Sequence, residues 1–309
     1  MLWIILIAIY LLTDSSAMFI DNYVSDVYFK GRLSTAQKVF SGWIYLLFAI
    51  IVILAVGINL NETSILTLFL VTLTGIIASV GSIAYYRALE LDDSTDVSIF
   101  FQLSPIFYLV FGWFLLGERF SPLQFVAFAM ILMGPLLIIM GSRKNSRKAK
   151  MRTVALVSLY VLIYTISNIL FVKINTGSTI DFRIAMACVF LGKGIGNLIL
   201  CYIIRPKWAK RWRHVVKSSK GKVYFPLTID LIFCLVKDVT YRLALLTAPA
   251  VAIASAASDS IEPVVVLVMG VLLTLISPKL GREKLDRKSL ISRLVATACV
   301  VVGIVVLQI

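Results

Sequence analysis

The sequence predicts an all-α membrane protein that crosses the bilayer many times. Hydrophobic residues make up 60% of the 309-residue chain and charged residues only 15%, and the mean hydropathy is +0.96. A soluble globular domain does not have this composition. A transmembrane helix needs about 20 apolar residues, and runs of that length follow one another with short polar segments between them. We therefore predict about ten transmembrane helices and no separate water-soluble domain.

The first half of the chain holds five apolar runs. The first begins at Leu2 without the basic segment or small-residue cleavage site of a signal peptide, so we expect it to be retained as a helix. The predicted helices of this half cover residues 2–20, 40–58, 65–86, 97–116 and 122–140. Only residues 117–121 can reach water between the last two.

A short basic segment, residues 142–152, leads into five further apolar runs. The predicted helices of this second half cover residues 154–172, 180–203, 223–246, 250–276 and 290–307. We therefore divide the chain into a first five-helix repeat at residues 1–141, a basic linker at 142–152 and a second five-helix repeat at 153–309.

Motifs of the first half return in weaker form in the second. Tyr241–Leu245 corresponds to Tyr86–Leu89, and Glu262-Pro263 corresponds to Ser104-Pro105. Five helices per half is an odd number, so the second repeat must enter the bilayer upside down relative to the first. Inverted repeats of this kind are a transporter architecture.

The first half also carries a recognisable series of motifs. They are Ala88-Leu89, Ser104-Pro105, Leu116-Gly117-Glu118-Arg119 and Ser121-Pro122-Leu123-Gln124, followed by a glycine-containing apolar run. In this order they resemble one repeat of the EamA-like drug/metabolite transporter superfamily. The resemblance implies ten helices in two repeats and transport of a small organic molecule, without a cofactor.

The net charge of +14 reflects basic residues in the loops rather than a nucleic-acid partner. The loops on one predicted side of the membrane carry most of the 30 lysines and arginines, which places that side in the cytoplasm and both termini outside. The resemblance implies both termini inside instead. We expect the basic loops to meet anionic lipid headgroups.

The loop between the seventh and eighth predicted helices has an amphipathic pattern. Trp208, Trp212, Val215 and Val216 have helical spacing among basic residues. This pattern predicts a surface helix with its tryptophans at headgroup level; the alternative is a plain solvated loop.

Charged residues inside the predicted helices are the candidate site. A charge at the bilayer centre costs at least ~3 kcal/mol, so such residues mark substrate or ion pathways. The candidate substrate-binding or coupling residues are Asp14, Gln102, Lys193, Asp230, Lys237, Asp259 and Glu262. Carboxyl groups among them are candidates for proton coupling.

Three further residues are candidates for gating or for breaking a helix, namely Pro105, Glu118 and Pro263. Other residues have structural alternatives. The glycines beside Lys193 could serve close helix packing, and Asp238 with Arg242 has the i, i+4 spacing of a structural ion pair.

Together these patterns predict a secondary transporter of a small polar metabolite, amino-acid-like or related, in the cell membrane of a bacterium or archaeon. The alternatives are a lipid-linked sugar flippase, a nucleotide-sugar antiporter, or a structural or regulatory membrane protein that binds lipid or a partner. The chain lacks histidine clusters and catalytic motifs, so we expect no enzyme, no cofactor and no metal site.

Overall fold

A computed structural model describes residues 2–30, 34–57, 63–92, 94–101, 103–119, 121–123, 125–126, 129 and 144–276. Its regular elements are helical throughout, in agreement with the predicted all-α membrane fold. The elements of the first part are α1 (Leu2–Val27), η1 (Ser34–Gln37), α2 (Lys38–Val56), α3 (Ile65–Leu89), α4 (Ser94–Phe101), α5 (Ser104–Phe111) and η2 (Gly112–Leu116). Those of the second part are α7 (Lys144–Thr176), α8 (Phe182–Leu198), η3 (Ile199–Ile204), α9 (Pro206–Ser218), α10 (Tyr224–Thr247) and α11 (Val251–Ile276).

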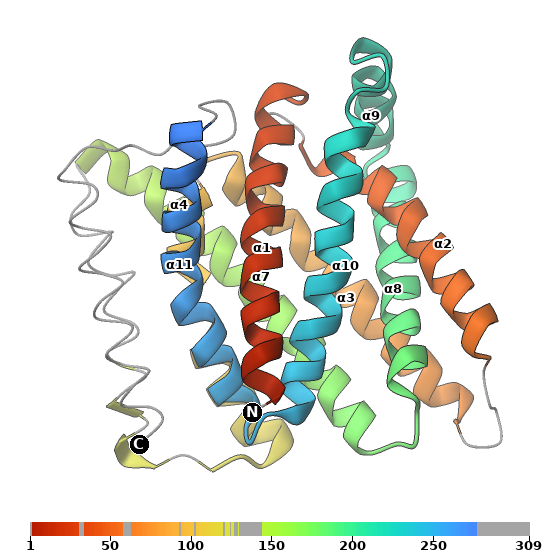
Figure 1. Cartoon of the computed structure of the whole chain (residues 1–309), viewed down its shortest axis with the longest axis vertical. Helices are drawn as coiled ribbons and strands as arrows, with labels where there is room; N and C mark the ends of the chain where they lie inside the picture. Colours follow the sequence, from red (N-terminus) through yellow and green to blue (C-terminus); the bar gives the residue numbers. More distant parts are fainter. Residues whose placement is uncertain are drawn as a thin grey trace.

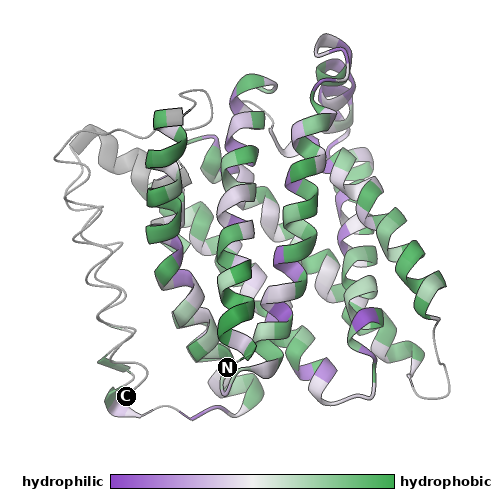
Figure 2. Ribbon diagram, in the orientation of Figure 1, coloured by the Kyte–Doolittle hydropathy of each residue, from purple (hydrophilic) through white to green (hydrophobic). Residues whose placement is uncertain are grey.

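Six helices of the described part are long and apolar enough to cross a membrane. Large hydrophobic side chains such as Leu54, Phe69 and Leu272 are exposed on their outer surfaces, as expected of surfaces that face lipid tails. Helix α10 is also 24 residues long, but its charged residues lie on its inner face. Figure 2 shows hydrophobic residues along most helix surfaces and hydrophilic ones on α9.

The helices pack as pairs that are distant in sequence. Helix α1 lies between α10 and α11, while α3 packs against both α7 and α8, and α2 packs against α8 (Figure 1). Helix α9 projects beyond the bundle at the end where α1 finishes and α10 begins. The interior is therefore bounded by helices from both halves of the chain.

The contact between α3 and α8 depends on glycine. A Cβ atom at Gly75 would lie 2.1 Å from the Val189 carbonyl oxygen, and one at Gly192 would lie 1.9 Å from the Thr72 carbonyl oxygen. Any side chain at either position would collide with the facing backbone. The packing role of the glycines beside Lys193 is therefore confirmed, as close helix approach in membranes requires.

Two predicted segments differ from the structure. The helix predicted over 97–116 is divided into α4, α5 and η2. The polar linker predicted over 142–152 is helical from Lys144 onward, because its basic residues are good helix formers and extend α7. The predicted helix at 290–307 and nearly all of that at 122–140 lie outside the described residues, as does Gln102.

The amphipathic segment forms helix α9, which confirms the helical alternative. Its tryptophans, however, do not face the surrounding lipid. Trp208 and Trp212 are buried against a cluster that includes Val24 and Phe29, and Trp212 stacks on Phe40 with ring centroids 6.1 Å apart. The tryptophans thus pack on an apolar surface of the bundle, and their depth in the membrane stays a prediction.

Candidate functional site

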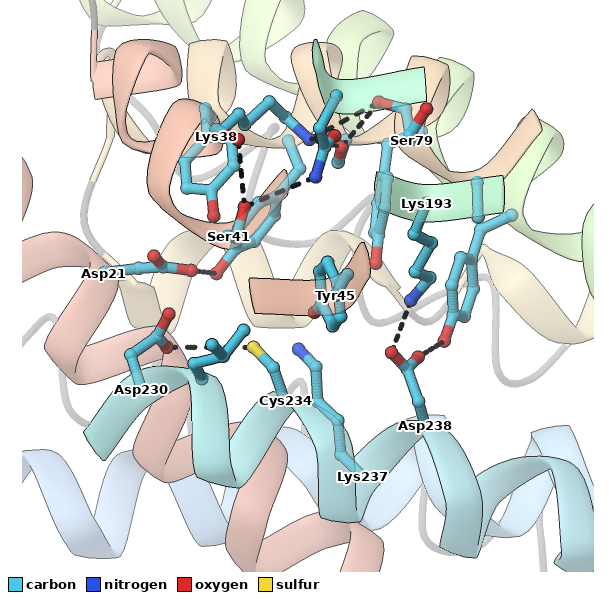
Figure 3. A pocket seen from close by; sticks show the side chains of 18 residues that line it. Asp21, Lys38, Ser41, Tyr45, Ser79, Lys193, Asp230, Cys234, Lys237 and Asp238 are labelled. Atoms are coloured by element: carbon cyan, nitrogen blue, oxygen red, sulfur yellow. Dashed lines mark hydrogen bonds and ion pairs between the residues drawn. The ribbon is translucent and has the colours of Figure 1, made fainter. Parts of the chain in front are cut away.

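A cavity inside the bundle collects charged side chains of both signs (Figure 3). Helices α1, α2, α3, α7, α8 and α10 supply its walls. Its charged lining residues are Asp21, Lys38, Lys193, Asp230, Lys237 and Asp238. Charges within a membrane bundle are tolerated where they face one another or a wet cavity, so this is the candidate site.

Helix α10 contributes most of these groups because of their spacing. Asp230, Cys234, Lys237 and Asp238 stand at i, i+4, i+7 and i+8, which places all four on one face of a helix. That face points into the cavity (Figure 3). Asp238 therefore belongs to the cavity wall, and the predicted ion pair of Asp238 with Arg242 is also present.

Asp238 is the most heavily bonded carboxylate of the cavity. It forms an ion pair with Lys193 of α8, and it accepts hydrogen bonds from Tyr164 Oη at 3.2 Å and from Arg242 Nη1 at 3.4 Å. Arg242 is fully buried, and its guanidinium forms an ion pair with Asp238. Lys193 lies across the cavity with its ammonium 5.7 Å from the centre of the Tyr45 ring.

A second ion pair connects the cavity to α1. Lys237 Nζ lies 2.5 Å from Asp14 Oδ1, and Tyr10 Oη donates to Asp14 Oδ2 at 2.8 Å. The structure thus brings together two of the predicted site residues, Asp14 and Lys237.

Lys38 is the cation of the cavity that lacks an acidic contact within the described part of the chain. It is buried at the start of α2. Its ammonium donates to Ser82 Oγ, to Asn197 Oδ1 at 3.1 Å and to the Ser79 carbonyl oxygen at 3.4 Å. Neutral oxygens orient the ammonium and leave its charge uncompensated by any contacting carboxylate. The predicted helix began only at residue 40, which left Lys38 in the preceding loop, whereas the structure includes Lys38 in α2.

Asp230 is the matching unpaired acid. Its side chain is buried, and its bond from a described residue is the weak one from Cys234 Sγ at 3.8 Å. No described lysine or arginine forms an ion pair with it. Asp21 is better satisfied, because Gln37 Nε2 donates to it at 2.6 Å and Tyr85 Oη at 3.3 Å.

Tyrosine rings form much of the remaining wall. Tyr160 packs against Tyr85 and Tyr164, with ring centroids 5.4 and 5.5 Å apart. The Lys38 ammonium lies 5.4 Å from the centre of the Tyr86 ring. Such a wall can contact apolar or cationic parts of a ligand through ring faces.

Two predicted acids lie outside the cavity, on α11. Asp259 accepts hydrogen bonds from Ser255 at 2.8 Å and Ser258 at 3.2 Å. Glu262 is fully buried, and neither carboxylate oxygen has a hydrogen-bond partner among the described residues. Both residues are close enough to Asp14 to interact with it electrostatically. The predicted set is thus divided into cavity residues and an acidic group, joined by the pair of Asp14 with Lys237.

Glu118, a predicted gating or helix-breaking residue, caps a helix in the structure. Its Oε1 accepts from the backbone N–H of Val251 at 2.7 Å, at the start of α11, where a carboxylate also meets the positive end of the helix dipole. Burial raises the pKa of Glu118, and its hydrogen bonds from Val251 and Ala252 oppose part of that rise. A Cβ atom at Gly112 would lie 2.5 Å from Glu118 Oε2, so glycine leaves room for this carboxylate.

The two predicted proline sites behave differently. Pro105 lies in the first turn of α5, where the missing N–H costs no hydrogen bond, so the helix does restart there. Helix α11 continues through Pro263, and the prediction of a helix break there was wrong. The proline only removes the N–H that would have bonded the Asp259 carbonyl group.

Sequence reasoning missed Asp21, Lys38 and the tyrosine wall. Asp21 and Lys38 were assigned to a loop because the apolar runs were taken to end at 20 and to begin at 40. The sequence did offer one signal, Tyr85-Tyr86 at the end of the predicted helix 65–86. A tyrosine hydroxyl within an apolar helix needs a polar partner. No group of residues that could hold a metal ion occurs in the described ranges.

Comparisons with known proteins agree with this fold. One solved structure, titled "Crystal structure of protein", is 17% identical and aligns over 96% of this chain and 95% of its own with a TM-score of 0.56. At that identity it shows a shared fold alone. No curated protein matches the chain. The profile of the EamA-like transporter family matches residues 2–140. This segment, which holds the motifs described above, is therefore similar to the EamA-like transporter family.

Proposed function

We propose that this protein is a secondary transporter that moves a zwitterionic, amino-acid-like metabolite across the membrane. The observation that carries the proposal is the pair of uncompensated charges in one cavity: Lys38 without an acidic contact and Asp230 without a basic one. A ligand with its own carboxylate and ammonium would compensate both. Leaving either charge unpaired in a low-dielectric site is costly.

The roles of the cavity residues follow from this complementarity. Asp230 would accept hydrogen bonds from the ammonium of the substrate. Lys38 would attract its carboxylate, with Lys193 and Lys237 adding positive potential while they remain paired to Asp238 and Asp14. The tyrosine rings would contact the rest of the substrate.

The same charges argue against a phosphate-bearing substrate. A nucleotide sugar or a lipid-linked sugar carries at least two negative charges, which several free basic groups would have to match. Two of the three lysines in this cavity are already paired with carboxylates. A flippase or nucleotide-sugar antiporter is therefore the weaker alternative.

Ligand binding by the purified protein tests the substrate class. An amino acid, its amide and the corresponding amine would be compared by thermal stabilisation. Asp230→Asn is expected to weaken binding of the amino acid by about 10- to 100-fold, as for loss of a charged hydrogen bond, and Lys38→Gln to abolish the preference for the amino acid over the amine.

The matched control is Asp181→Asn, an exposed acid outside the cavity, which should bind as the wild type does. If no zwitterion in the panel stabilises the protein, or if Asp230→Asn binds normally, the substrate assignment is wrong. A structural or regulatory role would then be the better account.

We further propose that Glu262 and Asp259 carry protons in exchange with the substrate. A fully buried carboxylate without a hydrogen bond is expensive, and protonation removes that cost. Asp14 connects this acidic group to the cavity through Lys237. A substrate carboxylate near Lys237 would change the net charge that Glu262 experiences while the pair with Asp14 stays intact, which is the differential interaction that coupling needs.

Proteoliposomes with an interior pH dye test the coupling. In Glu262→Gln, proton movement on addition of substrate should be lost, while exchange of labelled for unlabelled substrate persists. Loss of both activities in a folded variant would assign Glu262 to substrate binding or structure instead. Unchanged proton movement would contradict the coupling proposal.

Movement of the site between the two membrane faces would rest on two inverted repeats. Helix α1 packs on α10, and α7 packs on α3, so the first helix of each proposed half contacts the third helix of the other. Helices α1 and α7 run in opposite directions through the bundle (Figure 1). This exchange of partners is the arrangement expected of inverted repeats that rock against each other.

A further inference from the structure

A basic pocket lies at the end of the bundle, apart from the central cavity. The residues that follow α1, from Val27 to Lys30, form one side, and α9 with the turn after it forms the other. Its basic lining residues are Lys30, Arg211, His214, Lys220 and Lys222, and no acidic residue lines it.

Hydrogen bonds hold the two sides of this basic pocket together. Arg211 Nη2 donates to the Phe29 carbonyl oxygen at 2.9 Å, and Tyr28 Oη donates to the Lys222 carbonyl oxygen at 3.4 Å. Burial raises the pKa of Tyr28, so this donor stays protonated. Arg211 Nε is also buried and has no partner among the described residues. The pocket therefore contains an unused guanidinium donor.

The positive charge exceeds what the local helix ends require. Helices α1 and α9 both finish here, at Val27 and Ser218, and each C-terminus is equivalent to about −0.5 charge. Basic residues at helix ends often serve only to balance this charge. Here four permanent cations face about −1 from the two helix ends and one carboxylate close by in sequence, Asp26, so a net positive charge remains for an external anion.

The backbone also brings cations together at some cost. Lys30 and Lys220 are the two non-glycine residues of the described chain with left-handed backbone, at φ 55° and 51°. Non-glycine residues adopt left-handed backbone only at a cost in free energy, and residues held in this conformation cluster at functional sites. Asparagine or glycine would suit both turns better, and lysine is present instead.

We propose that this basic pocket binds a phosphate ester, namely the headgroup of an anionic phospholipid. Several cationic donors converge on one small surface, which suits a phosphate oxygen cluster. The pocket lies where α1 ends and α10 begins, and the neighbouring Val27 and Phe225 are exposed apolar side chains that acyl chains could cover. Basic pockets at this depth are suited to lipid headgroups.

Lipid binding to the purified full-length chain tests the proposal. Retention of phosphatidylglycerol would be measured by native mass spectrometry, with phosphatidylcholine as the uncharged comparison and glycerol 1-phosphate as the soluble phosphate ester. Lys30→Asn with Lys220→Asn removes two cations and leaves residues that accept left-handed backbone. This variant should bind phosphatidylglycerol at least about tenfold more weakly.

The matched control is Lys210→Gln with Lys217→Gln, which removes the same charge from α9 outside the pocket. It should bind phosphatidylglycerol within about threefold of the wild type. Equally weakened lipid binding in both double variants would indicate diffuse electrostatic attraction and would overturn the site. The site would also be overturned if neither phosphatidylglycerol nor glycerol 1-phosphate binds to the wild type. Binding of glycerol 1-phosphate as tight as that of the lipid, with the same dependence on the variants, would support the site and assign it to a soluble phosphate ester.

If the double asparagine variant fails to fold, Lys222→Gln is the substitute, since Lys222 lacks a left-handed backbone and should weaken lipid binding alone. The central cavity is not altered by any of these changes. Failure of the lipid site therefore leaves the transport proposal untouched, and failure of transport leaves the lipid site testable.

Discussion

Individual charges decide what this cavity can bind. Lys193 and Lys237 are neutralised by contacting carboxylates, so their presence alone says little about a substrate. Lys38 and Asp230 differ because the described residues around them provide hydrogen bonds without an opposite charge. The proposed specificity for a zwitterionic substrate follows from this difference.

Glu118 provides a pH-dependent prediction at the same scale. Burial raises its pKa in the folded protein above the ordinary 4.5, so the folded state holds the proton to higher pH than the unfolded state does. Stability from this group is therefore full below about pH 4.5 and is lost as pH rises through the raised value. The melting temperature of the wild type minus that of Glu118→Gln should fall from about pH 4 to about pH 7.

Asp181 is the opposite control. Its side chain caps α8 and bonds to Arg183, and that hydrogen bonding lowers the pKa of Asp181. Its stabilisation is present above the unfolded pKa and is lost as pH falls through the folded one. The melting temperature of the wild type minus that of Asp181→Asn should therefore change with pH in the opposite direction. Slopes of the same sign would contradict the assignment of Glu118 as a buried cap.

At the scale of elements, the contact between α3 and α8 sets the geometry of the cavity. Gly192 lies against the α3 backbone, and this contact fixes the position of the next residue, Lys193. A larger residue would move α8 away from α3 and carry Lys193 with it, so packing and site geometry are coupled here.

Gly75→Ala tests this coupling against Gly81→Ala in the same helix. A Cβ at Gly75 would meet a backbone oxygen at 2.1 Å, whereas one at Gly81 would meet the Ile163 side chain at 2.9 Å, a less severe approach. We expect Gly75→Ala to destabilise the protein by about 1–3 kcal/mol, and Gly81→Ala to destabilise it less, because its contact is milder and alanine favours the helix. Thermal unfolding in detergent measures both, and equal stability of the two variants would contradict the account.

Elements were easier to predict than the site. Apolar run length located most crossings because the bilayer imposes that length. It could not place Asp21 and Lys38, since polar residues at helix ends look like loop residues until a neighbouring helix buries them. It could not divide 97–116 either, because apolar length carries no information on local hydrogen bonding. Buried Asp14, Lys193, Asp230 and Lys237 were predictable from the cost of membrane charges.

At the scale of the whole molecule, the described helices pack asymmetrically, although the two proposed repeats would be equivalent. Helix α3 packs closely on α8, whereas α2 and α10, the corresponding pair of the proposed repeats, are not among the closely packed pairs of the described part. If the proposed inverted repeats rock against each other, these unequal contacts correspond to one of two alternating states. The opposite state would then separate α3 from α8.

A cross-link between α3 and α8 should therefore stop transport. A Cβ at Gly196 would lie 3.1 Å from Ser79 Cβ, so a small outward shift of the two helices would reach the separation of about 3.5–4.5 Å found in disulfides. Oxidised Ser79→Cys with Gly196→Cys should be inactive and should recover on reduction, with each single variant as control. Full transport by the cross-linked protein would show that these helices do not separate.

The most direct test of the account is exchange of a labelled amino acid into proteoliposomes loaded with the unlabelled compound, wild type beside Asp230→Asn. We predict accumulation of label by the wild type for at least one zwitterion, and loss of most of it in the folded variant. Label accumulation that is equal in both proteins would remove Asp230 from the pathway. No accumulation of any zwitterion by the wild type would contradict the central claim.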